Sequence, residues 1–316
     1  MNENIKYCST FNFDSSETVA YNNPLFPAYV RYGSLSYYPD YSAISHWHPD
    51  LEFILVKRGK MTYNVNGELT ELSDNNGIII NSRQIHFGFS MEHNECEFVC
   101  ILLSPELLQG NKWFYENYIE WFTENTSCPY LYLTHDNWQA AILDKIDMLY
   151  DSFCNDFDRI STQELSYFEL IEGFCFIMKT LYRNLPHTQQ MRKRNSADIA
   201  SLRNMITYIE EHYMEHITLQ DISLSGICCK SRCSLLFKKY LCDTPISYLT
   251  KFRLRKSLVA LLESESCITD IAYEYGFGGA SYYCEIFQKY YGISPLKYKK
   301  EQLKSKKDNS LAPPCF

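Results

Sequence analysis

The sequence lacks three features that would set it apart from ordinary globular proteins. It has no run of about 18 uncharged apolar residues, so no transmembrane helix and no membrane partner are expected. Its first residues, MNENIKYCSTFNF, contain no basic segment followed by an apolar run, so no secretory signal is expected. Its 13 cysteines follow no regular framework, and Cys228–Cys229 lacks the paired spacing of a zinc site. We therefore expect a cytoplasmic protein with reduced thiols.

Positive charge is also scarce, and it is unevenly distributed. The 316 residues carry a net charge of −8, and a chain of this length predicts two domains. Between Ser201 and Lys307 there are 16 Lys+Arg and 11 Asp+Glu, a balance of +5, whereas the rest of the chain has a balance of −13. The C-terminal third therefore has the charge needed to approach phosphate, although many solvated helical faces share this property.

Short β-rich segments separated by Gly, Asn or Asp occupy residues 29–104. They include LEFILVKRG, MTYNVNGELTELS, NGIIINS and CEFVCILLS, and the Asn-Gly pair in NVNGELT predicts a hairpin. Several short strands at close spacing predict a small barrel or sandwich. The irregular residues 1–28 before it are expected to form an N-terminal arm.

Helical periodicity replaces the strand pattern over residues 105–185. The segment ELSYFELIEGFCFIMKTLYRNL is apolar around most of its circumference, which predicts burial against the barrel and a second subunit. We therefore expect residues 105–185 to form a helical dimerisation segment in a homodimer. Residues 186–197 are polar and resemble a linker, residues 198–302 are helical, and residues 303–316 are expected to be a disordered tail.

The basic third contains an internal duplication. LFKKYLCDTPISYL (Leu236–Leu249) and IFQKYYGISPLKYK (Ile286–Lys299) align without gaps. Upstream, ITLQDISLSG and CITDIAYEYG also correspond, after a difference of one residue in length. Gly226 and Gly276 then follow as expected left-handed C-caps, so each copy predicts a helix-turn-helix. A solenoid would need three or more repeats, and a protein–protein adaptor would not need duplicated basic helices.

A single helix is predicted between the two copies. The segment ISYLTKFRLRKSLVALLES (Ile246–Ser264) has apolar residues at helical spacing. Such a helix would hold the two units a fixed distance apart. This arrangement suits a duplex, in which successive major grooves on one face recur about every 34 Å.

The duplicated region resembles a known family of regulators. ITDIAYEYGFGGASYYCEIFQKYYGISPLKYKK is similar to the signature of the AraC/XylS transcription regulators, and the resemblance covers about 100 residues. It implies a C-terminal all-α domain with two helix-turn-helix units that bind double-stranded DNA. The first unit departs from the pattern: Cys242 replaces the usual Gly, Cys229 replaces a usual Ser, and in the connecting helix Ser257 replaces a usual Ala.

The resemblance also assigns candidate roles to individual residues. The residues expected to begin the two recognition helices are Lys230, Ser231 and Arg232, and Gly279, Ala280, Ser281 and Tyr282. Arg232 is the candidate for a bidentate guanine contact. The residues expected to contact phosphate are Lys238, Lys239, Arg253 and Lys289. The residues expected to be core are Ile222, Phe237, Ile271, Ala272, Phe287 and Tyr283.

Histidines are concentrated in the predicted barrel. His46, His48 and Glu52 are separated by even numbers, so a continuous strand would direct all three to one face, where His86 could meet them. Three imidazoles and a carboxylate suit a divalent transition metal. The spacing His-x-His-x-x-x-Glu, followed by Gly59, resembles the first cupin motif. Arg83 and Ile85 replace the Pro and Gly that are usual in the second.

Two interpretations of this cluster stay open. The residues either bind a metal ion or line a small-molecule pocket without one, and the second is preferred because cupin-like domains that precede AraC-type modules resemble effector sensors. The further pocket candidates are Trp47, Tyr38, Phe87 and Arg58, and an aromatic pocket would suit a sugar or another small organic effector. No cofactor is required and no catalytic residue is assigned. The alternative is a cupin metalloenzyme with a helical accessory domain. The expected fold class is α+β with two domains.

Overall fold

The computed structural model describes residues 10–11, 17–125, 127–155, 163–186, 196–264 and 266–307. Glu17–Ser36 and Tyr41–Arg194 form one compact unit, and Asn195–Phe316 forms the bulk of a second. Parts of the expected arm (1–9 and 12–16), most of the expected linker (187–195) and the end of the expected tail (308–316) lie outside the described residues. Within the described residues, no helix is sufficiently long and apolar to span a membrane.

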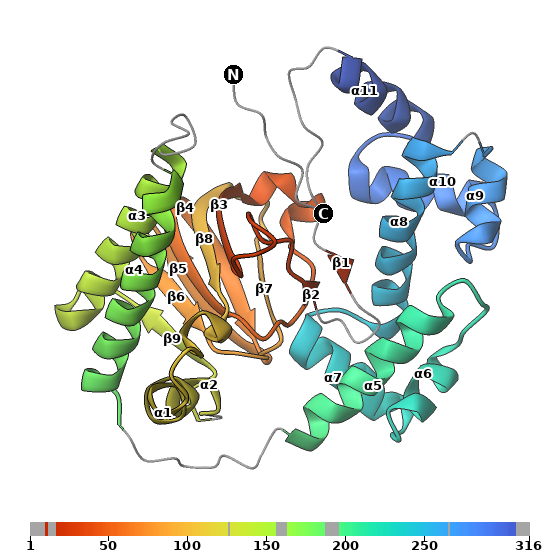
Figure 1. The fold of residues 1–316 in the computed structure, drawn as a ribbon. Helices are drawn as coiled ribbons and strands as arrows, with labels where there is room; N and C mark the ends of the chain where they lie inside the picture. Colours follow the sequence, from red (N-terminus) through yellow and green to blue (C-terminus); the bar gives the residue numbers. More distant parts are fainter. Residues whose placement is uncertain are drawn as a thin grey trace. The chain divides into compact units, whose positions relative to one another are not determined.

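The N-terminal unit is built on an antiparallel β-sheet (Figure 1). Its main strand order is β3-β8-β4-β6-β9, and β5 and β7 also pair with β4. The strands among the described residues are β1 (Thr10–Phe11), β2 (Glu17–Thr18), β3 (Ala28–Ser34), β4 (Leu51–Val65), β5 (Glu68–Ser73), β6 (Gly77–Ile80), β7 (His86–Phe89), β8 (Cys96–Leu103) and β9 (Tyr130–Leu133). Two 3-10 turns follow β3, at Leu35–Tyr37 and Pro39–Tyr41.

Strand β4 is one long strand where the sequence predicts two. Its first half pairs with β8 and β6, and its second half pairs with β5 and β7. A bulge between Val56 and Arg58, followed by Gly59 at φ 90°, bends the strand between these two sets of partners. A Cβ at Gly59 would overlap the carbonyl oxygen of Glu95, so only glycine fits there.

The predicted Asn-Gly hairpin is confirmed. Strand β4 ends at Val65 and β5 begins at Glu68, which leaves a two-residue turn. Asn66 has φ 51° and Gly67 has φ 84°. Positive φ at both central residues is what a type I′ turn requires.

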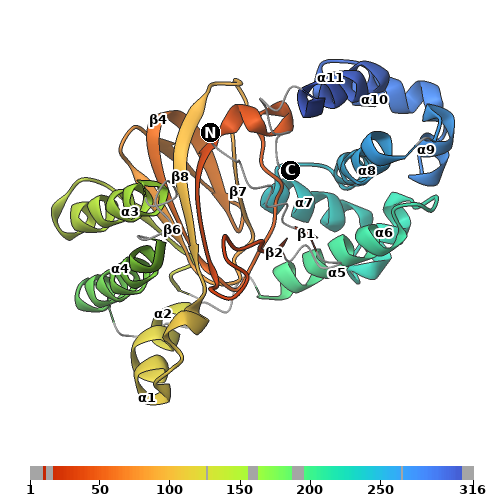
Figure 2. The same cartoon turned by 45° about the horizontal axis from the view of Figure 1, so that its top comes forward.

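Helices cover one face of the sheet (Figure 2). The elements after β8 are a 3-10 turn (Pro105–Leu108), α1 (Lys112–Phe114), a π-helical turn (Tyr115–Ile119), α2 (Glu120–Thr123), α3 (Asn137–Asn155) and α4 (Gln163–Asn184). Helices α3 and α4 lie side by side, and their apolar residues share one core with the strands, for example Phe53, Ile146 and Phe174. Phe168 on α4 is 75% exposed.

Strand β9 interrupts the region expected to be helical. Its four residues pair with β6 in antiparallel register, for instance Ile78 opposite Tyr132. The prediction missed it because the segment YLYL is too short for a periodicity signal, and its pairing partner is distant in the sequence.

The C-terminal unit is helical from Ser196 onward in the residues described. Its helices are α5 (Ser196–His212), α6 (Leu219–Ser225), α7 (Lys230–Leu241), α8 (Pro245–Glu263), α9 (Ile268–Glu274), α10 (Ala280–Tyr291) and α11 (Pro295–Lys307). Helix α11 reaches into the stretch expected to be a disordered tail. The pairs α6–α7 and α9–α10 are the two predicted helix-turn-helix units, and α8 is the predicted single helix between them.

The glycines that end the first helices have different roles. Gly276 has the predicted positive φ, 76°. Gly226 has φ -84°, and Ile227 takes the left-handed conformation instead. Gly226 is needed for space, because a Cβ there would lie 2.5 Å from Cγ of Met205. The prediction of a left-handed cap at Gly226 is therefore wrong.

The predicted core residues of the C-terminal unit are confirmed. Ile222, Phe237, Ile271, Ala272, Phe287 and Tyr283 all have no exposed surface. The Tyr283 hydroxyl lies 3.1 Å from Oγ of Ser257, the position where the family usually has Ala. Ser257 donates its own proton to the Leu254 carbonyl, so Tyr283 donates to Ser257.

Candidate DNA interface and histidine cluster

The candidate recognition helices are α7 and α10, each 12 residues long. Both are followed by a left-handed residue, Cys242 at φ 53° and Gly292 at φ 74°. Cys242 therefore adopts the conformation of the glycine that it replaces. At the start of α7, Lys230, Ser231 and Arg232 are exposed. At the start of α10, Ser281 and Tyr282 are exposed, and Gly279 and Ala280 are half-buried.

Arg232 is exposed but already paired within the protein. Its Nη2 forms an ion pair and hydrogen bond with Oδ1 of Asp198, near the start of α5. The side chain of Arg232 is 46% exposed and that of Asp198 is 22% exposed. A guanine contact by Arg232 would therefore compete with Asp198.

Arg253 has a structural role that the sequence did not reveal. Its Nε donates to the carbonyl of Tyr213 at 2.6 Å, and its Nη2 donates to the carbonyl of Glu215 at 2.7 Å. Burial lowers the pKa of its guanidinium, and Tyr282 nearby acts in the opposite direction. Gly276 leaves room for the guanidinium, because a Cβ there would lie 2.9 Å from Nε. Arg253 therefore ties α8 to the end of α5 through Nε and Nη2, and its expected contact to phosphate stays a prediction.

The predicted phosphate-binding lysines are exposed near the ends of the recognition helices. Lys238, Lys239 and Lys289 lie in the last turns of α7 and α10. Nζ of Lys239 lies 4.6 Å from the ring centroid of Tyr240, and Nζ of Lys289 lies 5.7 Å from that of Tyr290. Positively charged side chains near the C-terminus of a helix also interact favourably with the helix dipole. The position of these lysines is therefore explained without DNA.

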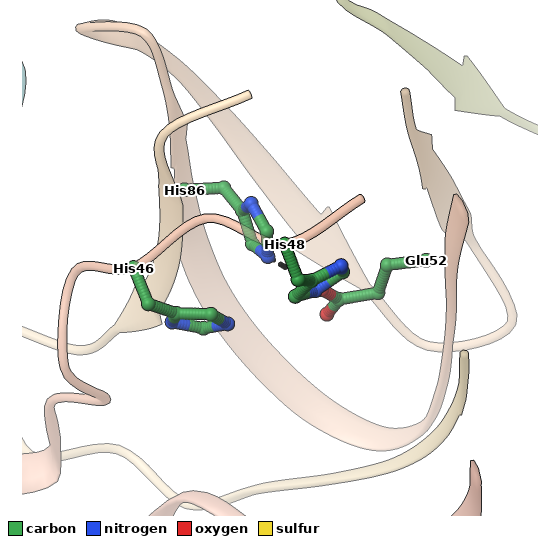
Figure 3. A group of neighbouring side chains, drawn as sticks. All are labelled: His46, His48, Glu52 and His86. Atoms are coloured by element: carbon green, nitrogen blue, oxygen red, sulfur yellow. Dashed lines mark hydrogen bonds and ion pairs between the residues drawn. The ribbon is translucent and has the colours of Figure 1, made fainter. Parts of the chain in front are cut away.

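The three histidines and Glu52 converge in the N-terminal unit (Figure 3). One donor atom from each lies within 4.8 Å of the others, and all but His46 are buried. The sequence predicts that these four side chains meet. The prediction of one continuous strand through His46, His48 and Glu52 is wrong. Only Glu52 belongs to β4, whereas His46 and His48 lie in the segment before it, and His86 begins β7.

Backbone pairing brings the histidines together. His46 and His86 form an isolated antiparallel bridge, in which each backbone N–H donates to the other's carbonyl, at 3.1 and 2.9 Å. Each imidazole Nδ1 also contacts a backbone carbonyl. The pairs are His46–Ile44 at 2.7 Å, His48–Asp50 at 3.2 Å and His86–Gln84 at 2.8 Å.

The Glu52 carboxylate lies among the imidazoles. Its Oε2 is 2.5 Å from Nε2 of His86 and 3.2 Å from Nε2 of His48. Burial alone would raise the pKa of Glu52, but His86 and His48 hold it well below its usual range. The carboxylate is therefore ionised, and it is the acidic member of the cluster.

Several predicted pocket residues do not join this cluster. Arg58 is exposed on the second half of β4, beyond the bulge, and its place in a pocket stays a prediction. Phe87 alternates with His86 along β7 and stacks on Phe89, so it faces the opposite side of the strand from His86. Trp47 and Tyr38 are half-buried, and their roles stay predictions.

Tyr63 also contacts the cluster, and its position in the sequence did not predict this contact. Its hydroxyl donates to Oε1 of Glu52 at 2.7 Å, and its ring stacks on His86 with centroids 6.3 Å apart. Glu52 and Tyr63 are an odd number of positions apart, so strict alternation along β4 would put them on opposite faces. The bulge at Val56/Arg58 inserts one residue and reverses that parity.

A β-sheet unit with a buried polar cluster, followed by two helix-turn-helix units, is the architecture of a ligand-binding transcription regulator. Two family descriptions match this chain: the AraC-like ligand binding domain over residues 29–135, and a helix-turn-helix domain over residues 229–301. The uncharacterized HTH-type transcriptional regulator YdeC of Bacillus subtilis is 30% identical over 81% of this chain and 85% of its own length. The chain belongs to the AraC family of transcriptional regulators.

Other relatives are more distant. The HTH-type transcriptional activator RhaS of Citrobacter koseri is 21% identical over 79% of this chain and 85% of its own length. Among solved structures, unsaturated fatty acid bound ToxT of Vibrio cholerae aligns over 86% of this chain and 94% of its own, with 12% identity and a TM-score of 0.37.

Proposed function

We propose that this protein is a ligand-responsive, sequence-specific regulator whose N-terminal unit binds a small-molecule effector and dimerises. The observation that carries the proposal is the pair of helix-turn-helix units in matching register, with the first residues of each recognition helix accessible. In such units these residues reach base edges in the major groove. As a DNA-binding regulator the protein would act in the cytoplasm, and we assign it no enzymatic activity.

Within this proposal, specificity and affinity come from different residues. Arg232, Ser281 and Tyr282 contact base edges or nearby phosphates, because they lie at the exposed starts of the recognition helices. Lys238, Lys239 and Lys289 contact phosphate, because they are exposed cations in the last turns of those helices. The second unit keeps the family pattern more fully than the first, so we expect it to contribute more to sequence preference.

Footprinting with the full-length protein tests the DNA-binding proposal. We expect protection of two adjacent major grooves per subunit on a selected site. Arg232→Ala should relax sequence preference by about 1–3 kcal/mol at one base pair. Lys289→Ala should weaken binding on all sequences and reduce the slope of log affinity against log salt by about 1.

Lys112→Ala is the matched control, because it removes one exposed lysine from the N-terminal unit. It should leave both specificity and salt slope unchanged. Absence of any preferred site, or equal losses of specificity for Arg232→Ala and Lys289→Ala, would refute the proposed division of roles.

Dimerisation through the N-terminal helices is proposed because two large apolar side chains on them are exposed. Met148 on α3 is 59% exposed and Phe168 on α4 is 75% exposed. Sedimentation of the full-length protein should show a dimer, and Phe168→Glu should shift it toward monomer. A wild-type protein that sediments as a monomer at every concentration tested would refute this part.

The effector site is proposed to lie at the cluster of His46, His48, Glu52 and His86. A ligand that binds the native state raises the melting temperature. Candidate effectors, sugars first, can therefore be screened by thermal shift. A true effector should stabilise the wild type more than the Glu52→Gln variant.

A further inference from the structure

We propose that the two recognition helices select chemically different bases. Leu235 on α7 contacts the methyl group of a thymine, and Glu285 on α10 accepts a hydrogen bond from the amino group of a cytosine. Neither side chain is among the base and phosphate contacts named under the proposed function. These contacts rest on that function, since they specify the base pairs that its DNA interface would recognise.

The outward side of α7 is defined by the position of the core. The side chains that α7 buries are Cys233, Leu236, Phe237, Tyr240 and Leu241. At about 3.6 residues per turn, the side of the helix opposite to them carries Ser231, Leu235 and Lys238. All three are exposed, and Leu235 is 51% exposed. A helix that enters the major groove with its core side toward the protein turns this outward side toward the bases.

The second recognition helix presents the same three positions. The residues of α10 that correspond to the outward side of α7 are Ser281, Glu285 and Gln288, and all three are exposed. The buried side of α10 includes Tyr283 and Phe287. The serine is the same in both units, whereas the middle position is leucine in the first and glutamate in the second. An apolar and an acidic side chain cannot read the same base, so this position distinguishes the two units.

Glu285 places a carboxylate on a surface that has to approach phosphate. Among the residues that the structure describes, it forms no ion pair, although Lys289 follows it by four positions. Nζ of Lys289 instead lies 5.7 Å from the ring centroid of Tyr290. An unpaired carboxylate here weakens binding to DNA in general. This cost is offset on a site that offers the carboxylate a hydrogen-bond donor.

The base that Glu285 selects follows from the groups exposed in the major groove. An ionised carboxylate can only accept hydrogen bonds. Cytosine presents its N4 amino group there, whereas guanine presents two acceptors and thymine presents one beside its methyl group. Adenine presents a donor next to an acceptor. Glu285 is therefore matched to cytosine and is repelled most strongly by guanine.

Leu235 selects a base by a different mechanism, because its side chain can neither donate nor accept a hydrogen bond. The one apolar group on a base edge in the major groove is the thymine methyl. Contact between this methyl and Leu235 removes apolar surface from water on both sides. Against cytosine or adenine the same side chain would separate an amino group from water without replacing its hydrogen bond. Leu235 is therefore matched to thymine.

Replacing thymine by uracil tests the first contact, because it removes only the methyl group. A preferred site is first selected from random duplexes with the full-length protein, and each thymine in it is then replaced in turn. At one thymine we expect wild-type affinity to fall about 4-fold, the effect of one lost methyl. Leu235→Ala should not respond to that replacement. Leu224→Ala is the matched control, because it truncates an exposed leucine on α6 of the same unit, and it should respond like the wild type.

Glu285→Gln tests the second contact by a change of preference. The wild type should prefer cytosine to guanine at one position by about 5–150-fold. An amide forms two hydrogen bonds with adenine, so sites selected with Glu285→Gln should have adenine there. Its affinity for non-specific DNA should also rise, because one negative charge is removed. Glu274→Gln is the matched control, since it removes an exposed charge from α9 of the same unit, and it should leave the base preference unchanged.

The outcomes separate these contacts from the proposed function. Circular dichroism first verifies that each variant is folded. A preferred site at which no uracil replacement distinguishes Leu235→Ala from the wild type would overturn the thymine contact. A folded Glu285→Gln variant that selects the same bases as the wild type would overturn the cytosine contact. Either result leaves sequence-specific binding intact, whereas absence of any preferred site for the wild type would refute the proposed function and both contacts together.

Discussion

Asp198→Ala should increase the affinity of the protein for its preferred DNA site. In the structure Asp198 forms an ion pair with Arg232, the residue proposed to contact guanine. Arg232 must leave this partner to reach a base edge, so the pair subtracts its own free energy from binding. Partly exposed pairs of this kind contribute about 0.2–1 kcal/mol. Because about 1.4 kcal/mol corresponds to a factor of 10, removal of Asp198 should tighten binding by about 1.4–5-fold.

The assay is a double-mutant cycle measured by equilibrium DNA binding at fixed salt. Removing an acidic side chain also reduces repulsion from phosphate, so Asp198→Ala is measured in the wild type and in Arg232→Ala. The gain should be larger when Arg232 is present, and the difference isolates the competition between Asp198 and guanine. Equal gains in both backgrounds, or weaker binding by Asp198→Ala alone, would refute the reasoning. A melting curve of each variant controls for changes in α5.

Three further predictions concern the stability of the C-terminal unit, measured by thermal or denaturant unfolding of the full-length protein. Arg253→Lys should destabilise it by about 1–3 kcal/mol, because the ammonium lacks the fixed geometry by which Nε and Nη2 donate to the two carbonyls, and unchanged stability would contradict the structural role. Cys242→Gly should stabilise it by about 1 kcal/mol, and Gly292→Ala should destabilise it by a similar amount, because both positions are left-handed. Ser257→Ala should cost about 1–3 kcal/mol by leaving the buried Tyr283 hydroxyl unpaired, whereas the double variant with Tyr283→Phe should be closer to the wild type.

Local patterns in the sequence were sufficient to predict the helix-turn-helix units. The helices α7 and α10, the left-handed residues after them and the prolines that begin α8 and α11 recur at the same relative positions in both copies. Each depends on residues close in sequence, such as a capping side chain, a glycine or a proline. The buried aromatic residues Phe237, Phe287 and Tyr283 were implied by the family resemblance, and the structure confirms their burial.

Features that depend on distant residues could not be predicted. Arg253 and Arg232 look alike in sequence, but their partners lie 38–40 and 34 residues upstream. Only the fold shows that Arg253 is structural and that Arg232 competes with Asp198. In the sheet, one bulge reverses the alternation of side chains along β4, so that Tyr63 lies on the same face as Glu52 and contacts it. The histidine cluster was predicted from its residue types, and its actual geometry depends on a backbone bridge between His46 and His86.

Helix α8 has a consequence for the DNA that this protein can recognise. It is a single helix of 19 residues with a recognition unit at each end. At a rise of about 1.5 Å per residue it is about 28 Å long. Because a helix does not stretch or twist freely, it fixes the angular phase between the two units as well as their separation.

The spacing of the DNA site is constrained by this phase. Inserting one base pair between the two recognised segments would rotate one of them by about 34–36° around the duplex, since B-DNA repeats about every 10–10.5 base pairs. A rigid α8 cannot follow that rotation. Operators for this protein should therefore vary in base sequence much more readily than in the spacing between their two recognised segments.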